Sequence, residues 1–369
     1  MTTSISLRDC GDVLAVLPYQ LGYHPRRSVV LVALHGRRFG LIARVDLPPG
    51  PEVPRRMVDA VVGPLRREGA ERVIAVGFED EPDECVPLLL ALVEELESHG
   101  ADVVEVAVVR DGRRYSPTCA EPCCPPGGVP VPSADEVPGV AEFVALGVAP
   151  LPDRAALDAL VAADPASGPG PDPRGPGGPT GPAGARSGRR AAARAWATVL
   201  GPRPGDRRVV PDPPGLPGRP GPMALAAASL ADIPFRDALI AWLVPGLLER
   251  DTLDPTVLAL LDRRLPRWAG MGRWPAGNSD PGERRHLVEV LLGLCRAVPD
   301  TRPDDAAAVC TVAAQVAWSD GDGALARSAL DRALRLAPGY RLAGLLDQVV
   351  SRGVRPSTVA PPGSWGRAG

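Results

Sequence analysis

Three cysteines in the first half of the chain are the side chains whose type and spacing are best suited to chemistry. Cys119, Cys123 and Cys124 lie in one short segment, RRYSPTCAEPCCPPGGVPVP, between proline-rich turns. Three thiols on one loop can approach a soft metal ion together, as zinc and iron–sulfur sites require. The segment therefore predicts a candidate metal site, with zinc as the candidate ion.

Two other interpretations of this cysteine cluster stay open. A closed structural zinc site takes four ligands and usually contains C-x2-C pairs, whereas the spacing here is C-x3-C-C. A fourth ligand has to come from elsewhere, and His24, His35 and Cys10 are candidates by residue type alone. The first alternative to a metal site is that two of the thiols form a redox pair. The second is that all three pack as small hydrophobic groups in a tight turn.

A second candidate site is the acidic segment 79–84 (EDEPDE), together with His24. The segment follows an expected strand at 72–78, where open α/β sheets bind ligands, and its carboxylates are suited to Mg²⁺. The simpler interpretation is that these acids favour the start of the next helix. His24 precedes Pro25 and can act as a base or a ligand, although a lone histidine is more often a hydrogen-bonded turn residue.

Composition excludes several classes of chemistry. All 41 basic residues are arginine, so the chain can form no lysine Schiff base, no Walker A loop and no kinase-type Lys–Glu pair. The net charge of −3 argues against partners that are nucleic acids or anionic membranes. The first residues resemble no secretory signal and no apolar run is long enough to span a bilayer, so we expect a cytoplasmic protein with reduced cysteines.

The elements that position these side chains follow from the apolar pattern. We expect strands at 28–34, 39–47, 72–78 and 102–110, the first two as a hairpin, and helices at 52–68, 87–99 and 151–163. Because a helix between two strands implies parallel neighbours, residues 1–163 are predicted to form an α/β domain with a mixed sheet.

The rest of the chain is predicted to be helical beyond a linker. Residues 164–222 are rich in proline and glycine, so we expect a linker there, with a short helix near 189–200 and no regular structure through 164–188. Residues 223–353 read as an all-α domain, and 354–369 as a disordered tail.

One helical hairpin in that domain has a repeat-like pattern. Small residues and a terminal proline recur between Ala307 and Pro338 at positions typical of a tetratricopeptide hairpin, among them Gly321, Ala326 and Ala333. The alternative is an ordinary pair of antiparallel helices in an alanine-rich bundle.

Three stretches of the sequence resemble one family. They are the opening SLRDCGDVLAVLPYQLGYHPRRSVVLVAL, the cysteine segment RDGRRYSPTCAEPCCPPGGVPVP and the later AWSDGDGALARSALDRALRLAPGYRLAGLL. Together they are similar to members of the Domain of Unknown Function 4192 family. The resemblance implies a cytoplasmic protein of actinobacteria, and it implies no known activity.

Two functions follow from these observations. We expect a non-enzymatic binding or regulatory protein, whose partner is a protein or a small ligand and not nucleic acid or a membrane. The alternative is an enzyme of the α/β domain that uses His24, the acidic segment 79–84 or the cysteine turn, with a metal ion as its cofactor.

Overall fold

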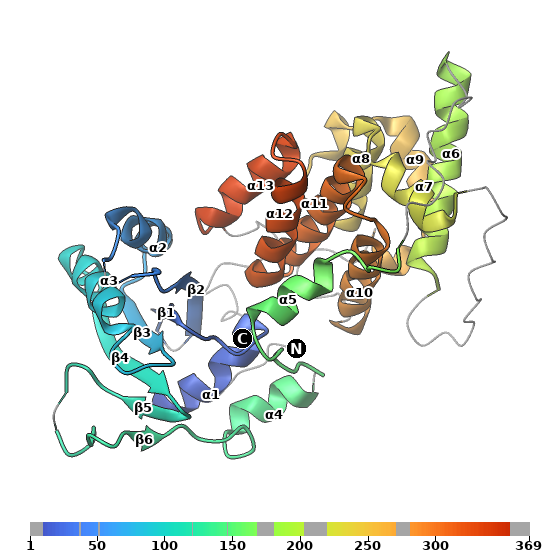
Figure 1. The fold of residues 1–369 in the computed structure, drawn as a ribbon. Coiled ribbons are helices and arrows are strands. Elements are labelled where there is room, and N and C mark those ends of the chain that lie inside the picture. Colours follow the sequence, from blue (N-terminus) through green and yellow to red (C-terminus); the bar gives the residue numbers. More distant parts are fainter. Residues whose placement is uncertain are drawn as a thin grey trace, which may run out of the picture. The chain divides into compact units, whose positions relative to one another are not determined.

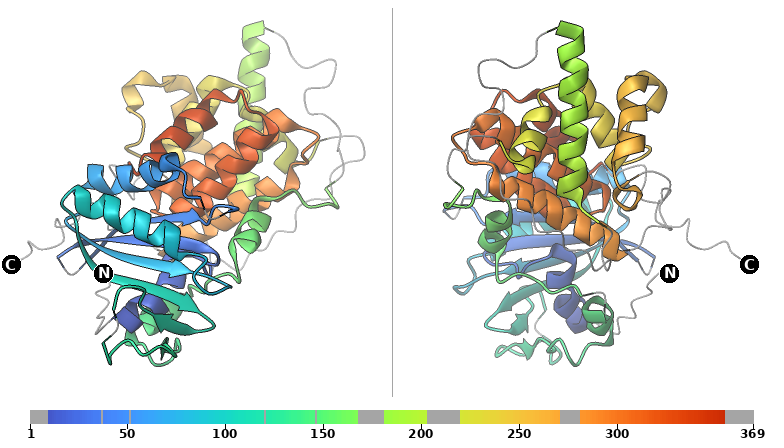
Figure 2. Two further views of the ribbon diagram at one scale, coloured as in Figure 1. Left: turned by 60° about the vertical axis from the view of Figure 1, so that its left-hand side comes forward. Right: turned by 90° about the vertical axis from the view of Figure 1, so that its right-hand side faces the viewer.

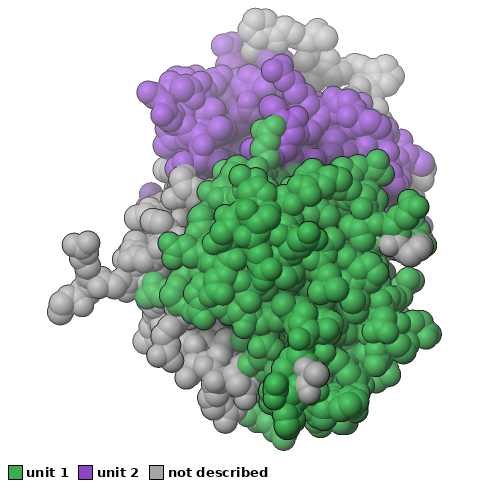
Figure 3. Space-filling model, turned by 90° about the vertical axis from the view of Figure 1, so that its left-hand side faces the viewer, with its two compact units in different colours: residues 1–157, 351–354, 361–369 green, residues 158–350, 355–360 purple. Residues whose placement is uncertain are grey.

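The computed structural model describes residues 10–36, 38–50, 52–119, 121–145, 147–167, 181–202, 220–270 and 281–354. They fall into two compact units, shown in green and purple in Figure 3. The first unit contains described residues up to 157 together with 351–354, and the second contains those from 158 to 350. The first is an α/β unit and the second is all-α, which confirms the two predicted fold classes.

A six-stranded mixed sheet forms the centre of the first unit (Figure 1). Its strands are β1 (Ser28–His35), β2 (Arg38–Asp46), β3 (Arg72–Phe78), β4 (Asp102–Arg110), β5 (Arg113–Tyr115) and β6 (Val129–Pro130). Their spatial order is β2-β1-β3-β4-β5-β6. β3 and β4 are parallel and the other neighbours are antiparallel, including the expected hairpin of β1 and β2.

Helices cover the sheet because its central strands are apolar on both sides. α2 (Arg55–Glu68) and α3 (Val86–Ser98) lie over one face, while α1 (Cys10–Leu21) and α4 (Pro138–Ala145) lie on the opposite side (Figure 2). Alternate residues of β1 pack with α2 and α3 in one core cluster, as Val29 and Leu31 illustrate. The residues between them, such as Val30, are equally buried, which is the pattern of a strand covered on both faces.

Gly77 in β3 allows the start of α3 to approach the sheet closely. A Cβ atom at Gly77 would lie 2.3 Å from the Cys85 Sγ, and Cys85 is fully buried. We therefore expect Gly77→Ala to lower the free energy of unfolding by about 1–3 kcal/mol, as overpacking of a core does. Chemical denaturation of the full chain, with hydrogen exchange of β3 as the readout, measures this loss.

A glycine in the same unit provides the control for this substitution. A Cβ atom at Gly50 would meet nothing within 4 Å, so Gly50→Ala should leave the stability nearly unchanged. Addition of Cys85→Ala to Gly77→Ala should recover part of the loss, because it removes the clashing sulfur. Equal stability of the Gly77→Ala and Gly50→Ala proteins would contradict the close approach.

The second unit is a bundle of helices. Its α-helices, apart from α5, are α6 (Gly181–Leu200), α7 (Pro222–Ser229), α8 (Ile233–Leu243), α9 (Pro255–Arg264), α10 (Pro281–Ala297), α11 (Pro303–Ser319), α12 (Gly323–Leu336) and α13 (Arg341–Ser351). Two short 3₁₀ turns, Arg250–Thr252 and Arg267–Ala269, flank α9, and α5 (Arg154–Val161) spans the boundary between the units. Nearly every residue of α11 is buried, because α7, α8, α10 and α12 all pack against it.

α6 is longer than the sequence suggested. The expectation of no regular structure through 164–188 is wrong for its last part, because the helix begins at Gly181. Pro182 stands in the first turn, where its missing N–H group is not needed, and no proline follows within the helix. The rest of the predicted linker, at 168–180 and 203–219, and the predicted tail from 355 onward lie outside the described residues.

Side chains anchor the C-terminal half of α6 in the second unit. Trp196 is fully buried, and its indole Nε1 donates a hydrogen bond to the Ser229 Oγ at 3.0 Å. Arg189 pairs with Asp232 at 2.7 Å and with Asp254 at 2.9 Å, so it joins the N-caps of α8 and α9.

Throughout the part of the chain that the structure describes, no helix is both long enough and apolar enough to cross a membrane.

Candidate functional site

The three clustered cysteines lie in the loop 116–128, which joins the two short strands at the end of the sheet. Arg113 of β5 closes the base of this loop, since its Nε and Nη2 donate to the carbonyl oxygens of Gly127 and Gly128 at 2.6 and 2.9 Å. Gly128 has a φ of +67°, and a Cβ atom there would lie 2.8 Å from the Tyr115 ring. A glycine is therefore needed where the chain turns back into β6.

Local hydrogen bonds fold the loop into consecutive turns. The Cys119 N–H donates to the Ser116 Oγ at 3.1 Å, and the Cys124 N–H donates to the Glu121 carbonyl at 2.8 Å. Several prolines restrict the backbone between these bonds and donate none of their own. They are Pro117, Pro122, Pro125 and Pro126. The loop therefore holds its cysteines in a restricted arrangement.

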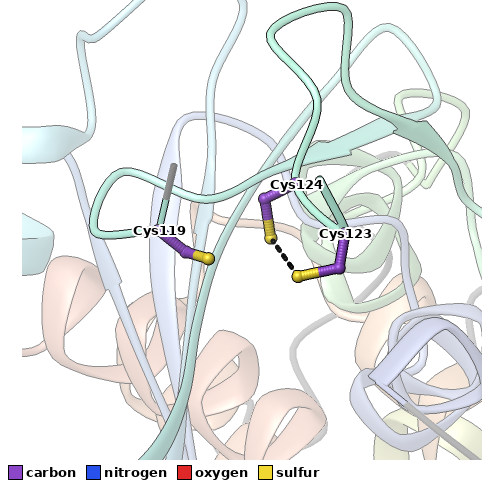
Figure 4. Close-up of side chains that lie close together, drawn as sticks. All are labelled: Cys119, Cys123 and Cys124. Atoms are coloured by element: carbon purple, nitrogen blue, oxygen red, sulfur yellow. Dashed lines mark hydrogen bonds between the residues drawn. The ribbon is translucent and has the colours of Figure 1, made fainter. Parts of the chain in front are cut away.

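This arrangement brings the three thiols together. The Sγ atoms of Cys119, Cys123 and Cys124 all lie within 4.8 Å of one another, and those of Cys123 and Cys124 are 3.9 Å apart (Figure 4). Sulfur ligands of a tetrahedral zinc ion are roughly 3.8 Å apart, given Zn–S bonds of about 2.3 Å. Among the residues that the structure describes, no other group of three His, Cys, Asp or Glu ligand atoms is so close.

The pKa values of two of the thiols are shifted in opposite directions. The backbone N–H of Glu121 and the thiols of Cys124 and Cys123 lower the pKa of Cys119. Hydrogen bonding to Cys119, together with partial desolvation, raises the pKa of Cys124 to about 11. Cys119 is thus the first of this pair to become a thiolate, and a metal ion would displace the remaining protons.

Charged side chains stand beside the thiols. Cys123 and Cys124 line a small pocket together with Glu105, Arg114, Tyr115, Ser116 and Val129. Arg114 of β5 and Glu105 of β4 form an ion pair of 3.2 Å across the two strands. Neither residue is among the candidates predicted from the sequence, although a glutamate within the apolar strand DVVEVAVVR is unusual enough to point to one of them.

The three candidates for a fourth ligand occupy different places. His24 is exposed, and its backbone N–H donates to the Leu151 carbonyl at 2.9 Å. The His35 Nε2 lies 3.3 Å from the Glu68 Oε1 of α2. Cys10 is the first residue of α1 and is partly buried, and its thiol is not part of the group of three.

The acidic segment is engaged in its own ion pairs. Glu79 is buried and its Oε1 lies 2.5 Å from the Arg110 Nη1, while its carboxylate also accepts from the N–H groups of Asp83 and Cys85. These bonds hold the turn before α3, which favours a structural role for Glu79.

Two further acids of the segment are paired as well. Asp80 lies 3.4 Å from the Arg26 guanidinium, and Glu84 lies 3.1 Å from that of Arg27. Glu84 also accepts from the Asp80 N–H at 2.8 Å. Neither His24 nor any residue of 79–84 is among the residues that line the thiol pocket.

Fold and site together define a two-unit protein with a three-thiol loop on the sheet of its α/β unit. The chain belongs to the family described as Domain of unknown function (DUF4192), whose model matches residues 11–357. This confirms the resemblance seen in the sequence. Neither a curated protein nor a solved structure matches the chain.

Proposed function

We propose that the protein is a non-enzymatic binding protein in which a zinc ion at Cys119, Cys123 and Cys124 fixes the loop 116–128 as a recognition surface. The observation that carries this proposal is the grouping of the three Sγ atoms within 4.8 Å. A metal ion bound there would lock the loop much as a small structural zinc site does. The recognised molecule would be a protein or a small ligand, in a cytoplasm where the thiols stay reduced.

The ion pairs of the acidic segment support the binding role over the enzymatic one. Glu79 is held by Arg110 and by two backbone N–H groups, so its oxygens are already used as acceptors. His24 contributes no ring atom to the lining of the thiol pocket. A general acid or base would have to stand within reach of the reacting group.

Metal analysis of the purified full chain tests the proposal. We expect one zinc ion per chain when the protein is prepared under reducing conditions, and we expect Cys123→Ser and Cys124→Ser to lose it. Cys85→Ala is the matched control, because Cys85 is a buried thiol of the same unit outside the cluster. The proposal fails if the unsubstituted chain holds no more metal than the Cys123→Ser protein and both variants keep the original stability.

We also propose that α11 and α12 form a tetratricopeptide-like hairpin. Support comes from the small residues Ala326 and Ala333, which are fully buried, and from Gly321 in the turn with a φ of +85°. Close helix approach at such positions is typical of this repeat. Because α11 is buried on nearly every side, the hairpin would act as the core of the helical bundle and not as an exposed binding groove.

A further inference from the structure

Cys123 is the exposed thiol of the protein. The chain has seven cysteines, and the structure describes them all. Of the other six, three are partly buried and three are buried, so Cys123 alone is exposed. Oxidation of cysteine depends on access as well as on thiolate character, and redox-sensing cysteines often stand beside a second thiol. An oxidant that arrives from solvent therefore meets Cys123 first.

Two other thiols lie within reach of the Cys123 sulfur. The Cys124 Sγ is 3.9 Å away, and the Cys119 Sγ lies within 4.8 Å (Figure 4). Because the S–S bond of a disulfide is about 2 Å long, either sulfur has to approach by less than about 3 Å. Rotation of an exposed side chain covers such a distance readily. Both partners are thus available by distance.

Backbone geometry favours Cys119 over Cys124 as the partner. The Cα atoms of adjacent residues are about 3.8 Å apart, whereas those joined by a disulfide usually lie about 4.4–6.8 Å apart. The Cys123–Cys124 pair is poorly able to adapt, since Pro125 restricts the backbone of Cys124. The Cys124 N–H is also held by the Glu121 carbonyl at 2.8 Å. Cys119 stands four residues away and has no such constraint.

We propose that a hydroperoxide oxidises the loop 116–128 to a Cys119–Cys123 disulfide and that the zinc ion is then released. The recognition surface would thus exist only while the loop is reduced. Disulfides of cytoplasmic proteins are mostly transient and serve such sensing roles. The release of the ion rests on the proposed function, whereas the formation of the disulfide needs only the three thiols.

The reaction balances in two steps. In the zinc-loaded loop the sulfurs are thiolates, and the Cys123 sulfur attacks the terminal oxygen of the hydroperoxide. An S–O bond forms, the O–O bond breaks, and the leaving oxygen takes a proton from solvent to depart as water or an alcohol. The Cys119 sulfur then attacks the sulfenic sulfur, the S–S bond forms, and the S–O bond breaks to release hydroxide, which a second solvent proton converts to water.

The outcome for the metal ion follows from this balance. The two sulfurs lose two electrons in total, and the hydroperoxide is reduced. Because a disulfide sulfur is no longer a thiolate, the ion keeps only Cys124 of its three ligands in the loop and leaves as a hydrated ion. A dithiol restores both thiols by exchange, so the change is reversible.

Treatment of the zinc-loaded full chain with hydrogen peroxide tests the inference. We expect the intact mass to fall by two hydrogen atoms and peptide mapping to find Cys119 joined to Cys123. A chromophoric chelator should detect zinc release at the same rate as the crosslink forms, and dithiothreitol should reverse both changes. Cys85→Ala, which lacks a buried thiol outside the cluster, should behave like the unsubstituted chain.

Two variants of the loop separate the roles of the thiols. Cys124→Ser loses its zinc under the proposed function, yet it should still form the Cys119–Cys123 crosslink. Cys119→Ser should stop at the sulfenic acid of Cys123, which a cyclic 1,3-diketone traps as a stable adduct.

The outcomes distinguish this inference from the proposed function. A crosslink between Cys123 and Cys124, or three free thiols after peroxide treatment, overturns the inference and leaves the metal centre standing. A Cys119–Cys123 crosslink that forms while the zinc stays bound overturns the regulation by release. If the untreated chain holds no zinc, the proposed function is wrong, and peptide mapping still decides whether the disulfide forms.

Discussion

Arg332→Met is expected to lower the free energy of unfolding of the helical unit by about 3–5 kcal/mol, the cost of breaking a buried charged network. Arg332 of α12 is buried, and its guanidinium donates to the carbonyl oxygens of Val161, Cys295 and Val298. These carbonyls stand at or just beyond the C-terminal ends of α5 and α10. Methionine fills similar volume but leaves the carbonyls without their donor, at about 1–3 kcal/mol each when buried.

Arg335→Met is the matched control for this substitution. Arg332 pairs with Asp300 at 2.8 Å, and Arg335 of the same helix pairs with the same carboxylate at 3.4 Å, but the Arg335 side chain is 62% exposed. Such surface pairs contribute about 0–1 kcal/mol. Tryptophan fluorescence during urea unfolding reports on this comparison, because the first 157 residues contain no tryptophan. Equal midpoints for the two variants would show that Arg332 does not hold the helix ends.

The same network makes the stability depend on pH in a defined direction. Partial burial raises the pKa of Asp300, but the hydrogen bonds and charges of Arg332 and Arg335 outweigh this and lower it. A carboxyl whose folded-state pKa is lowered stabilises the fold above its unfolded-state pKa, and this contribution is lost as the pH falls through the folded-state pKa. The difference in stability between the unsubstituted chain and Arg332→Met should therefore shrink in acid.

Trp196→Ala should lower the free energy of unfolding of the helical unit by about 3–5 kcal/mol, as large-to-alanine changes in a core do. The indole of Trp196 is fully buried and bonded to Ser229, so α6 depends on it for its attachment to the unit. Urea unfolding followed by the remaining tryptophans measures the loss, and hydrogen exchange of α6 locates it.

Arg186→Ala provides the control on the same helix. Arg186 is exposed, so its removal should change the stability by less than about 0.5 kcal/mol. Rapid exchange along the whole of α6 in the unsubstituted chain would contradict the attachment. So would a Trp196→Ala protein whose unfolding midpoint equals that of Arg186→Ala.

Local patterns were enough to predict the framework of the first unit. Apolar runs such as SVVLVAL and RVIAVGF gave their strands, since a strand covered on both faces needs little besides continuous hydrophobicity. The short strands β5 and β6 were not predicted because they have only three and two residues, and each is held by its pairing, β5 with β4 and β6 with β5. The start of α6 was not predicted, because the proline and glycine content of a whole segment does not show where in that segment the last proline lies.

The candidate site could be predicted in its loop but not in its surroundings. Cys119, Cys123 and Cys124 are neighbours in the chain, so their proximity in space required no knowledge of the fold. The ion pair of Glu105 with Arg114 depends on how β4 pairs with β5, a strand of only three residues. No pattern within a short window contains that information.

The burial of α11 has a consequence for the synthesis of the chain. α7 and α8 pack against α11, yet they leave the ribosome earlier, because α11 lies more than sixty residues further along the chain. Until α11 emerges, their apolar faces have no partner, and exposed apolar surface of this kind invites aggregation or chaperone binding. Nascent chains that end before Pro303 should therefore be held by chaperones, whereas those that extend beyond α12 should be released.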